Sequence, residues 1–203
     1  MRRLLVLLVA LFLLPAVTRA LTVVPRTFDE LVARASAAFK GTVTAIDPQW
    51  VGTGAARHIV TFVTFRVDET YKGDAASAWT LRFFGGTVDG TTMEVPDMPR
   101  FAVGQTAVLF EAGNGQQFCP LVGVHQGRFH VTRDSAGVER ITTDDHSPVT
   151  STAEIGQLEA DGVTPRLRRH ALAHEPGMTL DGFRTEIRSK VAAGRNAPGQ
   201  LQP

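Results

Sequence analysis

The sequence predicts a mainly β fold: a small antiparallel barrel, closed or partly open, with one helix before it and one amphipathic helix after it. Five or more short segments alternate apolar and polar residues, as half-buried strands do. Apolar residues recur at helical spacing in one segment before these strands and in one after them. A β-sandwich is the alternative, and glycines at strand ends or inside strands favour the barrel, whose corners and bulges use glycine. These glycines are Gly73, Gly85, Gly86, Gly104, Gly123 and Gly127.

The first 20 residues have the pattern of a secretory signal peptide. Arg2 and Arg3 supply positive charge, residues 4–14 form an apolar run, and Ala20 offers a small residue at the cleavage position. A membrane-spanning helix needs about 20 apolar residues, so a cleaved signal is favoured over a membrane anchor. We therefore expect an exported protein, periplasmic or extracellular, with no transmembrane segment after cleavage.

A helix is predicted directly after this signal, followed by the first strand. Thr27 and Glu30 form the pattern of a capping box, which satisfies backbone N–H groups at the start of a helix. We expect the helix over residues 28–38. Alternation and β-branched residues then replace the helical spacing, so a strand is predicted over residues 39–46. The residues at helical spacing are Phe28, Leu31, Val32, Ala35 and Phe39.

The strand-rich part of the chain extends to residue 142. Residues 58–67 are apolar on both faces of a strand, so we expect this strand to be covered on both sides. Residues 87–100 hold prolines, aspartates and a glycine, and are predicted to form a long irregular loop with room for a short strand. Gly113-Asn114-Gly115 predicts a hairpin turn. Further strands are expected over residues 79–84, 107–111, 118–124, 127–133 and 138–142.

The end of the chain predicts a linker and a second helix. Residues 146–176 lack alternation and are rich in Ser, Thr, Pro and Arg. Thr179 is suited to cap a helix over residues 179–193 that stops at Gly194, and the residues after 195 are expected to fray. Its apolar stripe needs a surface to cover, and docking on the barrel is favoured over docking on a partner. The stripe consists of Leu180, Phe183, Ile187 and Val191.

Composition and charge exclude disorder throughout the chain and argue against a nucleic-acid partner. With 43% hydrophobic and 20% charged residues, the chain has the profile of a folded protein and is not disordered throughout. Removing the three arginines of the signal takes the 21 basic residues to 18, against 20 acidic ones, for a net charge of −2. A phosphate-binding face needs a clustered basic excess, so no nucleic-acid partner is expected.

Cys119 is the single cysteine, so no disulfide can form within the chain. We interpret it as a half-buried, small apolar residue. The alternatives are a nucleophile or redox group assisted by His125, and a disulfide to another chain.

Short turn and core motifs between residues 39 and 131 resemble those of uncharacterised secreted bacterial proteins with a netrin-like OB barrel, the fold of the tissue inhibitors of metalloproteinases. The resemblance implies an OB-like barrel fold, and we expect this domain, with its leading helix, over residues 21–145. The motifs are Phe39-Lys40-Gly41-Thr42-Val43, Tyr71-Lys72-Gly73, Phe101-x-Val103-Gly104-Gln105, Val108-Leu109-Phe110 and Gly123-x-x-Gln126-Gly127-x-Phe129.

The resemblance implies a fold and transfers no functional residue. In those inhibitors, the mature chain begins with a cysteine that chelates the zinc of the protease, and disulfides fix that edge. This chain would begin at Leu21, with no cysteine nearby. A protease partner would therefore rest on fold analogy alone.

Catalytic and metal-binding patterns are weak, and we assign no catalytic residue, cofactor or metal ligand. His125 and His130 would point to opposite faces of strands, so we interpret them as polar surface residues. His170, His174 and Glu175 lack a fixed third ligand for zinc. Asp144-Asp145-His146 is interpreted as a polar strand end. The sequence also lacks a nucleophile elbow, a P-loop and a dinucleotide-binding fingerprint.

The function that we predict is an exported, non-enzymatic β-barrel module that binds another macromolecule, most simply a protein. The expected contact loop covers residues 95–101, and its contact residues are Met98, Pro99, Arg100 and Phe101. The alternative is a loop that only packs over the end of the barrel. One alternative is a hydrolase whose site is assembled from distant residues, with His125 or Cys119 in a cleft. The other is an OB domain that binds oligonucleotides or saccharides.

Overall fold

The structure is a computed structural model that describes residues 24–156 and 176–196. Three predicted segments lie wholly or partly outside the described residues: the signal peptide (1–20), most of the linker (146–176) and the end of the C-terminal helix and frayed tail (177–203). His170, His174 and Glu175 also lie outside them.

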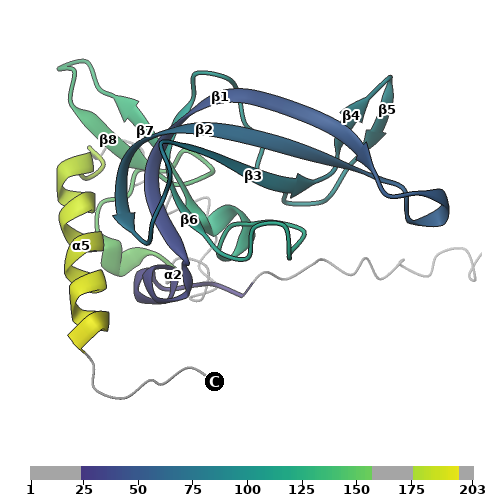
Figure 1. Ribbon diagram of the computed structural model, residues 1–203. Coiled ribbons are helices and arrows are strands. Elements are labelled where there is room, and N and C mark those ends of the chain that lie inside the picture. Colours follow the sequence, from purple (N-terminus) through teal and green to yellow (C-terminus); the bar gives the residue numbers. More distant parts are fainter. Residues whose placement is uncertain (1–23, 157–175, 197–203) are drawn as a thin grey trace, which may run out of the picture.

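The fold is mainly β, as predicted. Its main sheet has six antiparallel strands in the order β3-β2-β1-β6-β7-β8, and β4 and β5 form a separate hairpin (Figure 1). Among the described residues, β3 and β8 stand at the two ends of this order and do not pair with each other. The strands are β1 (Ala37–Val51), β2 (His58–Lys72), β3 (Ala78–Phe84), β4 (Gly86–Val88), β5 (Thr91–Met93), β6 (Thr106–Glu111), β7 (Arg128–Arg133) and β8 (Glu139–Thr142).

The first helix, α2 (Phe28–Arg34), begins with the predicted capping box. The Glu30 N–H donates to the Thr27 hydroxyl (3.3 Å), and the Thr27 N–H donates to the Glu30 carboxylate (3.0 Å). The predicted end at residue 38 is wrong. The helix stops at Arg34 because β1 begins at Ala37 and pairs with β6. The apolar residues that follow the helix are therefore part of the sheet. Lys72 donates to two carbonyls at the end of the helix, those of Val32 and Ala33.

β1 is shared by two parts of the sheet. Residues 38–42 pair with β2 on one edge and with β6 on the other, whereas residues 45–51 pair with β2 alone. The register with β2 shifts between Val43 and Ala45, and such a bulge bends a strand. Beyond it, β1, β2 and β3 continue as an extension that we call the sheet arm: residues 43–51, 58–67 and 78–84. Figure 1 shows the arm reaching away from α2 and α5 toward the β4–β5 hairpin.

Two apolar clusters fill the interior. The first lies between the sheet and the helices, where the Phe110, Phe129 and Phe183 rings meet with centroids 4.9 to 6.4 Å apart. The second contains Phe65 on one face of the arm, which we call its inner face, and extends past the arm to Phe39. Aromatic pairs at such separations stabilise a core beyond their buried area.

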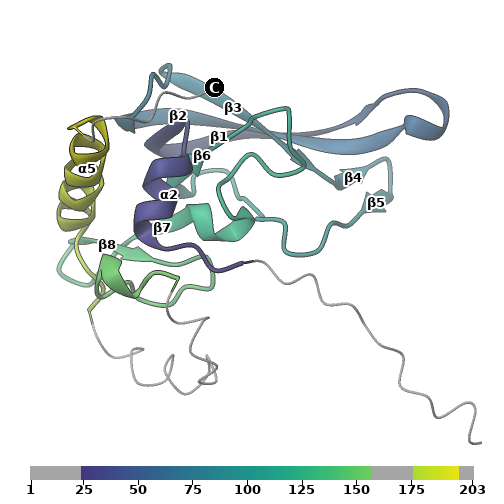
Figure 2. The ribbon, with the colours of Figure 1, turned by 90° about the horizontal axis from the view of Figure 1, so that it is seen from below.

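The C-terminal helix, α5 (Leu180–Asn196), lies beside α2 (Figures 1 and 2). Its apolar side chains pack in the first cluster. Phe183 and Ile187 are fully buried there, so the apolar stripe covers the chain's own sheet. The Thr179 hydroxyl accepts from the Gly182 N–H (3.1 Å), as a capping residue does. The helix continues through Gly194, so the predicted stop at that residue is wrong.

Two connecting segments also differ from the prediction. Residues 118–124 form no strand: only Leu121 makes a bridge, to Glu111, before a short 3-10 helix (Val124–Gly127). Gly123 is left-handed (φ 64°), which stops the extended backbone. Within the predicted linker, Val149 is buried and exchanges backbone hydrogen bonds with Ile141 and Met178. The described part of that segment therefore joins β8 to the chain before α5.

No helix of the described residues has the length and apolar character needed to cross a bilayer.

Replacing Phe129 with alanine should destabilise the protein by about 3–5 kcal/mol, because the ring is fully buried and its removal leaves a cavity. Denaturant unfolding of the variant and the wild type measures the difference. Phe118→Ala is the matched control, since that side chain is 45% exposed. Equal losses for the two variants would contradict the core assignment.

Candidate functional site

A groove of about 550 Å³ lies along the inner face of the sheet arm. One wall is the sheet, and the other is the β4–β5 hairpin together with the segment after it. We call this segment, residues 94–105, the groove loop. The two ribbon views place the hairpin beside the far end of β1 and β2 (Figures 1 and 2). The lining residues are Ile46, Pro48, Thr61, Val63, Phe83, Phe84, Gly85, Gly86, Thr87, Thr92, Met93, Glu94, Val95, Met98, Pro99, Arg100 and Phe101.

The strand register explains the apolar wall. Ile46 on β1 lies opposite Val63 on β2, and Thr61 lies opposite Phe83 on β3. Cross-strand partners share a face, so these side chains form one continuous surface. Sequence reasoning missed them as lining residues, because alternation marked their face without showing what covers it.

The hairpin approaches the sheet closely at Gly86. A Cβ atom at this position would lie 2.4 Å from the Thr61 hydroxyl, and φ is 138°. The Thr61 hydroxyl also donates to the Gly85 carbonyl (2.7 Å). Glycine is therefore required here, where it lets the hairpin sit directly on β2 at one end of the groove.

All four predicted contact residues line the groove. Phe101 packs edge-on against Phe65, with ring centroids 5.4 Å apart, and Met98 lies against the same cluster. Pro99 is buried. Arg100 is exposed at the rim, where it forms an ion pair with Glu94 (3.2 Å). The predicted loop thus supplies apolar side chains to the wall and Arg100 to the rim, where Glu94 just before the loop pairs with it.

A buried polar cluster holds the end of the groove loop. Arg128 on β7 is 5% exposed, forms an ion pair with Asp144 and donates to the backbone carbonyl of Arg100. Its guanidinium carbon lies 4.7 Å from the centroid of the Phe101 ring. A buried guanidinium needs such partners, and here they include two residues of the groove wall.

His130 belongs to the same cluster, so the prediction of a surface residue is wrong. It is 3% exposed because β7 lies between β6 and β8, where His130 pairs with Ala107 and Thr142. Its ring stacks on His146 with centroids 4.5 Å apart. Burial lowers the pKa of His130 below 6.5, and the charges of Arg128 and His146 lower it further. His125 lies in the 3-10 helix and on no strand.

Cys119 lies in the arm cluster with 2% exposure, which makes it more deeply buried than expected. Burial raises the pKa of its thiol to about 11. Because the thiolate is the reactive form, this position is unsuited to nucleophilic attack. In the described part of the chain, no three His, Cys, Asp or Glu residues are grouped to hold a metal ion.

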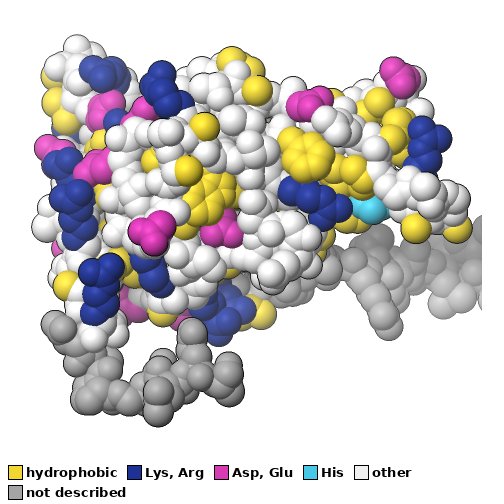
Figure 3. All heavy atoms as spheres, viewed as in Figure 1, with side chains coloured by type: hydrophobic (Ala, Val, Ile, Leu, Met, Phe, Trp, Pro, Cys, Tyr) yellow, Lys and Arg dark blue, Asp and Glu magenta, His cyan; other side chains and the backbone are white. Residues whose placement is uncertain are grey.

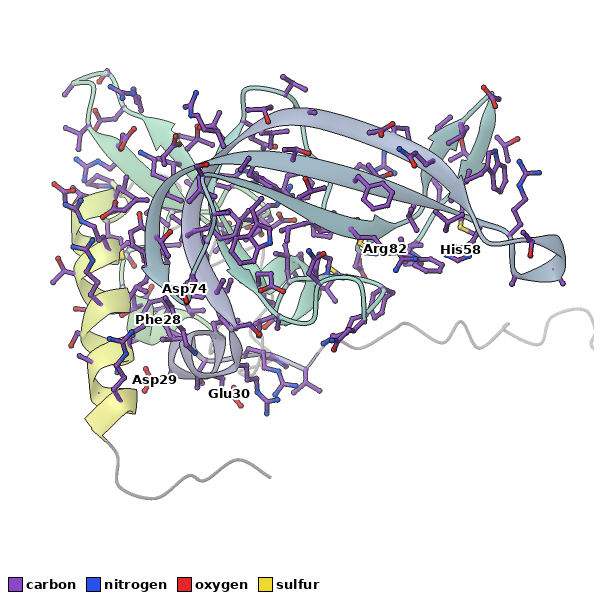
Figure 4. The ribbon with its side chains drawn as sticks, viewed as in Figure 1. Phe28, Asp29, Glu30, His58, Asp74 and Arg82 are labelled. Atoms are coloured by element: carbon purple, nitrogen blue, oxygen red, sulfur yellow. The ribbon has the colours of Figure 1, made fainter. Side chains whose placement is uncertain are left out.

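A second polar and aromatic cluster lies at the far end of the arm, where β2 begins and β3 ends (Figure 4). His58 stacks on Phe84 with centroids 4.4 Å apart, and its Nε2 accepts from Arg82 (3.3 Å). Its Nδ1 donates to the Ala56 carbonyl (2.8 Å). Figure 3 shows a histidine side chain beside Lys or Arg and hydrophobic side chains on the face seen in Figure 1. The contacts tie the start of β2 to the end of β3.

Comparison with protein-family models, with curated proteins and with solved structures gave no match for this chain.

Replacing Arg128 with glutamine should cost about 3–5 kcal/mol, because it leaves the Asp144 carboxylate without its buried partner. Thermal or denaturant unfolding measures the loss. Arg133→Gln on the same strand is the control: its ion pair with Glu139 is exposed, with the arginine side chain 71% accessible, and should contribute at most about 1 kcal/mol. A loss below that of the control would show that Arg128 does not anchor the loop.

Proposed function

We propose that this protein is an exported, non-enzymatic binding module that holds an apolar anchor of a protein partner in the groove. The observation that carries the proposal is the groove itself. Its volume of about 550 Å³ lies within the range of about 300–1,000 Å³ usual for binding sites, and its walls are mostly apolar. Buried apolar anchors in such pockets dominate the energy of protein interfaces.

The rim of the groove favours a protein partner. Arg100 and Glu94 are 88% and 74% exposed, and an ion pair so exposed contributes little to stability. Both side chains are therefore free to pair with charges of a partner. Met98 adds an unbranched, adaptable side chain to the wall. An apolar centre with a polar rim is the usual composition of a protein interface.

We also propose that the sheet is a partly open OB-like barrel of the netrin-like kind. Its support is the β6–β7 connection, which covers the free edge of β3. The Arg82 N–H donates to the Asn114 side chain (3.0 Å), Asn114 donates to the Thr80 carbonyl (2.9 Å), and the Phe84 N–H donates to the Phe118 carbonyl (2.9 Å). A loop thus occupies the place where a closing strand would pair. Since no match supports the family, a protease as partner remains an analogy of fold.

Site-specific photo-crosslinking tests the binding function. A photoreactive amino acid at position 100, on the groove rim, should link the exported protein to one recurrent partner in the periplasm or the medium. The same group at position 138 is the control, because Val138 is 37% exposed and lies outside the groove. The adducts are identified by mass spectrometry. Equal adducts at both positions, or none at either, would contradict the proposal.

A charge in the groove tests the role of its apolar wall. Met98→Glu should lower the yield of the position-100 adduct by about tenfold, since burying an unpaired carboxylate against an apolar anchor is costly. Val138→Glu should leave the yield unchanged. Circular dichroism of both variants verifies that they are folded. An unchanged yield for a folded Met98→Glu protein would place the contact elsewhere.

A further inference from the structure

Gln105 connects His130 to the groove loop through one side chain. Its Oε1 accepts from the Ala102 N–H (3.2 Å), and its Nε2 lies 3.0 Å from Nδ1 of His130. A backbone N–H needs an acceptor, so the amide oxygen faces Ala102 and the NH₂ group faces the ring. Nδ1 of His130 therefore accepts a hydrogen bond and carries no proton.

The proton of the neutral ring must then be on Nε2. This nitrogen is buried without a hydrogen-bond partner among the described residues, and it lies 3.8 Å from Oδ1 of Asp144. Arg128 bonds the same oxygen. A second proton could be added only at Nδ1, the position that now accepts from Gln105.

The surroundings of His130 set the pH at which the ring takes up a second proton. Arg128 on its own strand and His146 from the segment after β8 oppose a positive charge on the ring, whereas Asp144 from that segment favours it. Gln105, from the segment before β6, is neutral. Burial and the two basic neighbours prevail, so the pKa lies below 6.5. Protonation of His130 is therefore less favourable in the folded protein than in the unfolded one. The free energy of unfolding falls as the pH drops below 6.5.

We propose that His130 is a proton-sensitive contact that fixes the groove loop when neutral and loosens it when acidification protonates the ring. A proton taken from solvent onto Nδ1 makes this nitrogen a donor that faces the NH₂ group of Gln105. The amide must turn to present its oxygen to the imidazolium. That turn removes the acceptor of the Ala102 N–H.

Protonation of His130 would also loosen the groove loop through Arg128. The imidazolium and Arg128 would share one carboxylate, that of Asp144, which weakens the hold on Arg128. Arg128 in turn binds the Arg100 carbonyl and covers the Phe101 ring. Phe101 also packs against Phe65 and other rings of the arm, so the loop loosens without leaving the sheet. Partner release at acid pH would rest on the proposed function, whereas the loosening itself does not.

Amide exchange measured by NMR on the exported chain, without a partner, tests the contact. Between about pH 7.5 and about pH 5, exchange at Ala102, corrected for intrinsic rates, should accelerate at least about threefold. The Phe84 N–H, which bonds the Phe118 carbonyl, is the internal control and should not change. His130→Asn retains an acceptor for Gln105 but takes up no proton, so its Ala102 exchange should be insensitive to pH.

The outcomes separate the two proposals. Ala102 exchange that stays constant in the wild type, or that accelerates equally in His130→Asn, overturns the role of His130 whatever the crosslinking shows. If His130→Asn does not fold, the wild-type titration decides. The ring signals of His130 and the side-chain NH₂ signals of Gln105 must then shift with one midpoint, and different midpoints overturn the proposal. Failure of the crosslinking alone contradicts only the groove as a partner site.

Discussion

The double pairing of β1 is the constraint on which the rest of the structure depends. Over residues 38–42 this strand has hydrogen-bonded neighbours on both edges, and beyond Ala45 it has only β2. The arm therefore extends past β6, and the short β4–β5 hairpin and the groove loop cover its inner face. Two apolar clusters result, one under the helices and one on the arm. The groove lies on the second, because the hairpin and the groove loop fill that face incompletely.

The groove loop is irregular and forms no strand of the sheet. Contacts with buried polar side chains position it. Arg128 is tolerated in the interior because Asp144 balances its charge and the Arg100 carbonyl accepts one of its donors. His130 is tolerated because Gln105 donates to it and also holds Ala102. The contacts that satisfy these buried side chains therefore position one end of the groove wall. Stability and the shape of the groove depend on the same few hydrogen bonds.

Local sequence patterns predicted the helices and strands that are determined by interactions between residues close together in the chain. The capping box at Thr27 started a helix, and the stripe containing Phe183 marked the helix that covers the sheet. Prediction was wrong where a distant segment decides. α2 ends early because β6 pairs with Ala37, and Leu121 is confined to a single bridge because the left-handed Gly123 turns the chain toward β7. The composition of residues 95–101 marked a loop that lines the groove, but its opposite wall depended on the strand register.

By itself, the sequence determined the mainly β class, the two helices and the loop that lines the groove. Periodicity and capping act between neighbours along the chain, and these can be read in order. Only the tertiary structure decided that His130 is buried, that Arg128 reaches the groove loop and that Ile46 and Phe83 share a wall. Those contacts join residues far apart in sequence, and their partners are chosen by strand pairing and by the need of every buried polar group for a partner.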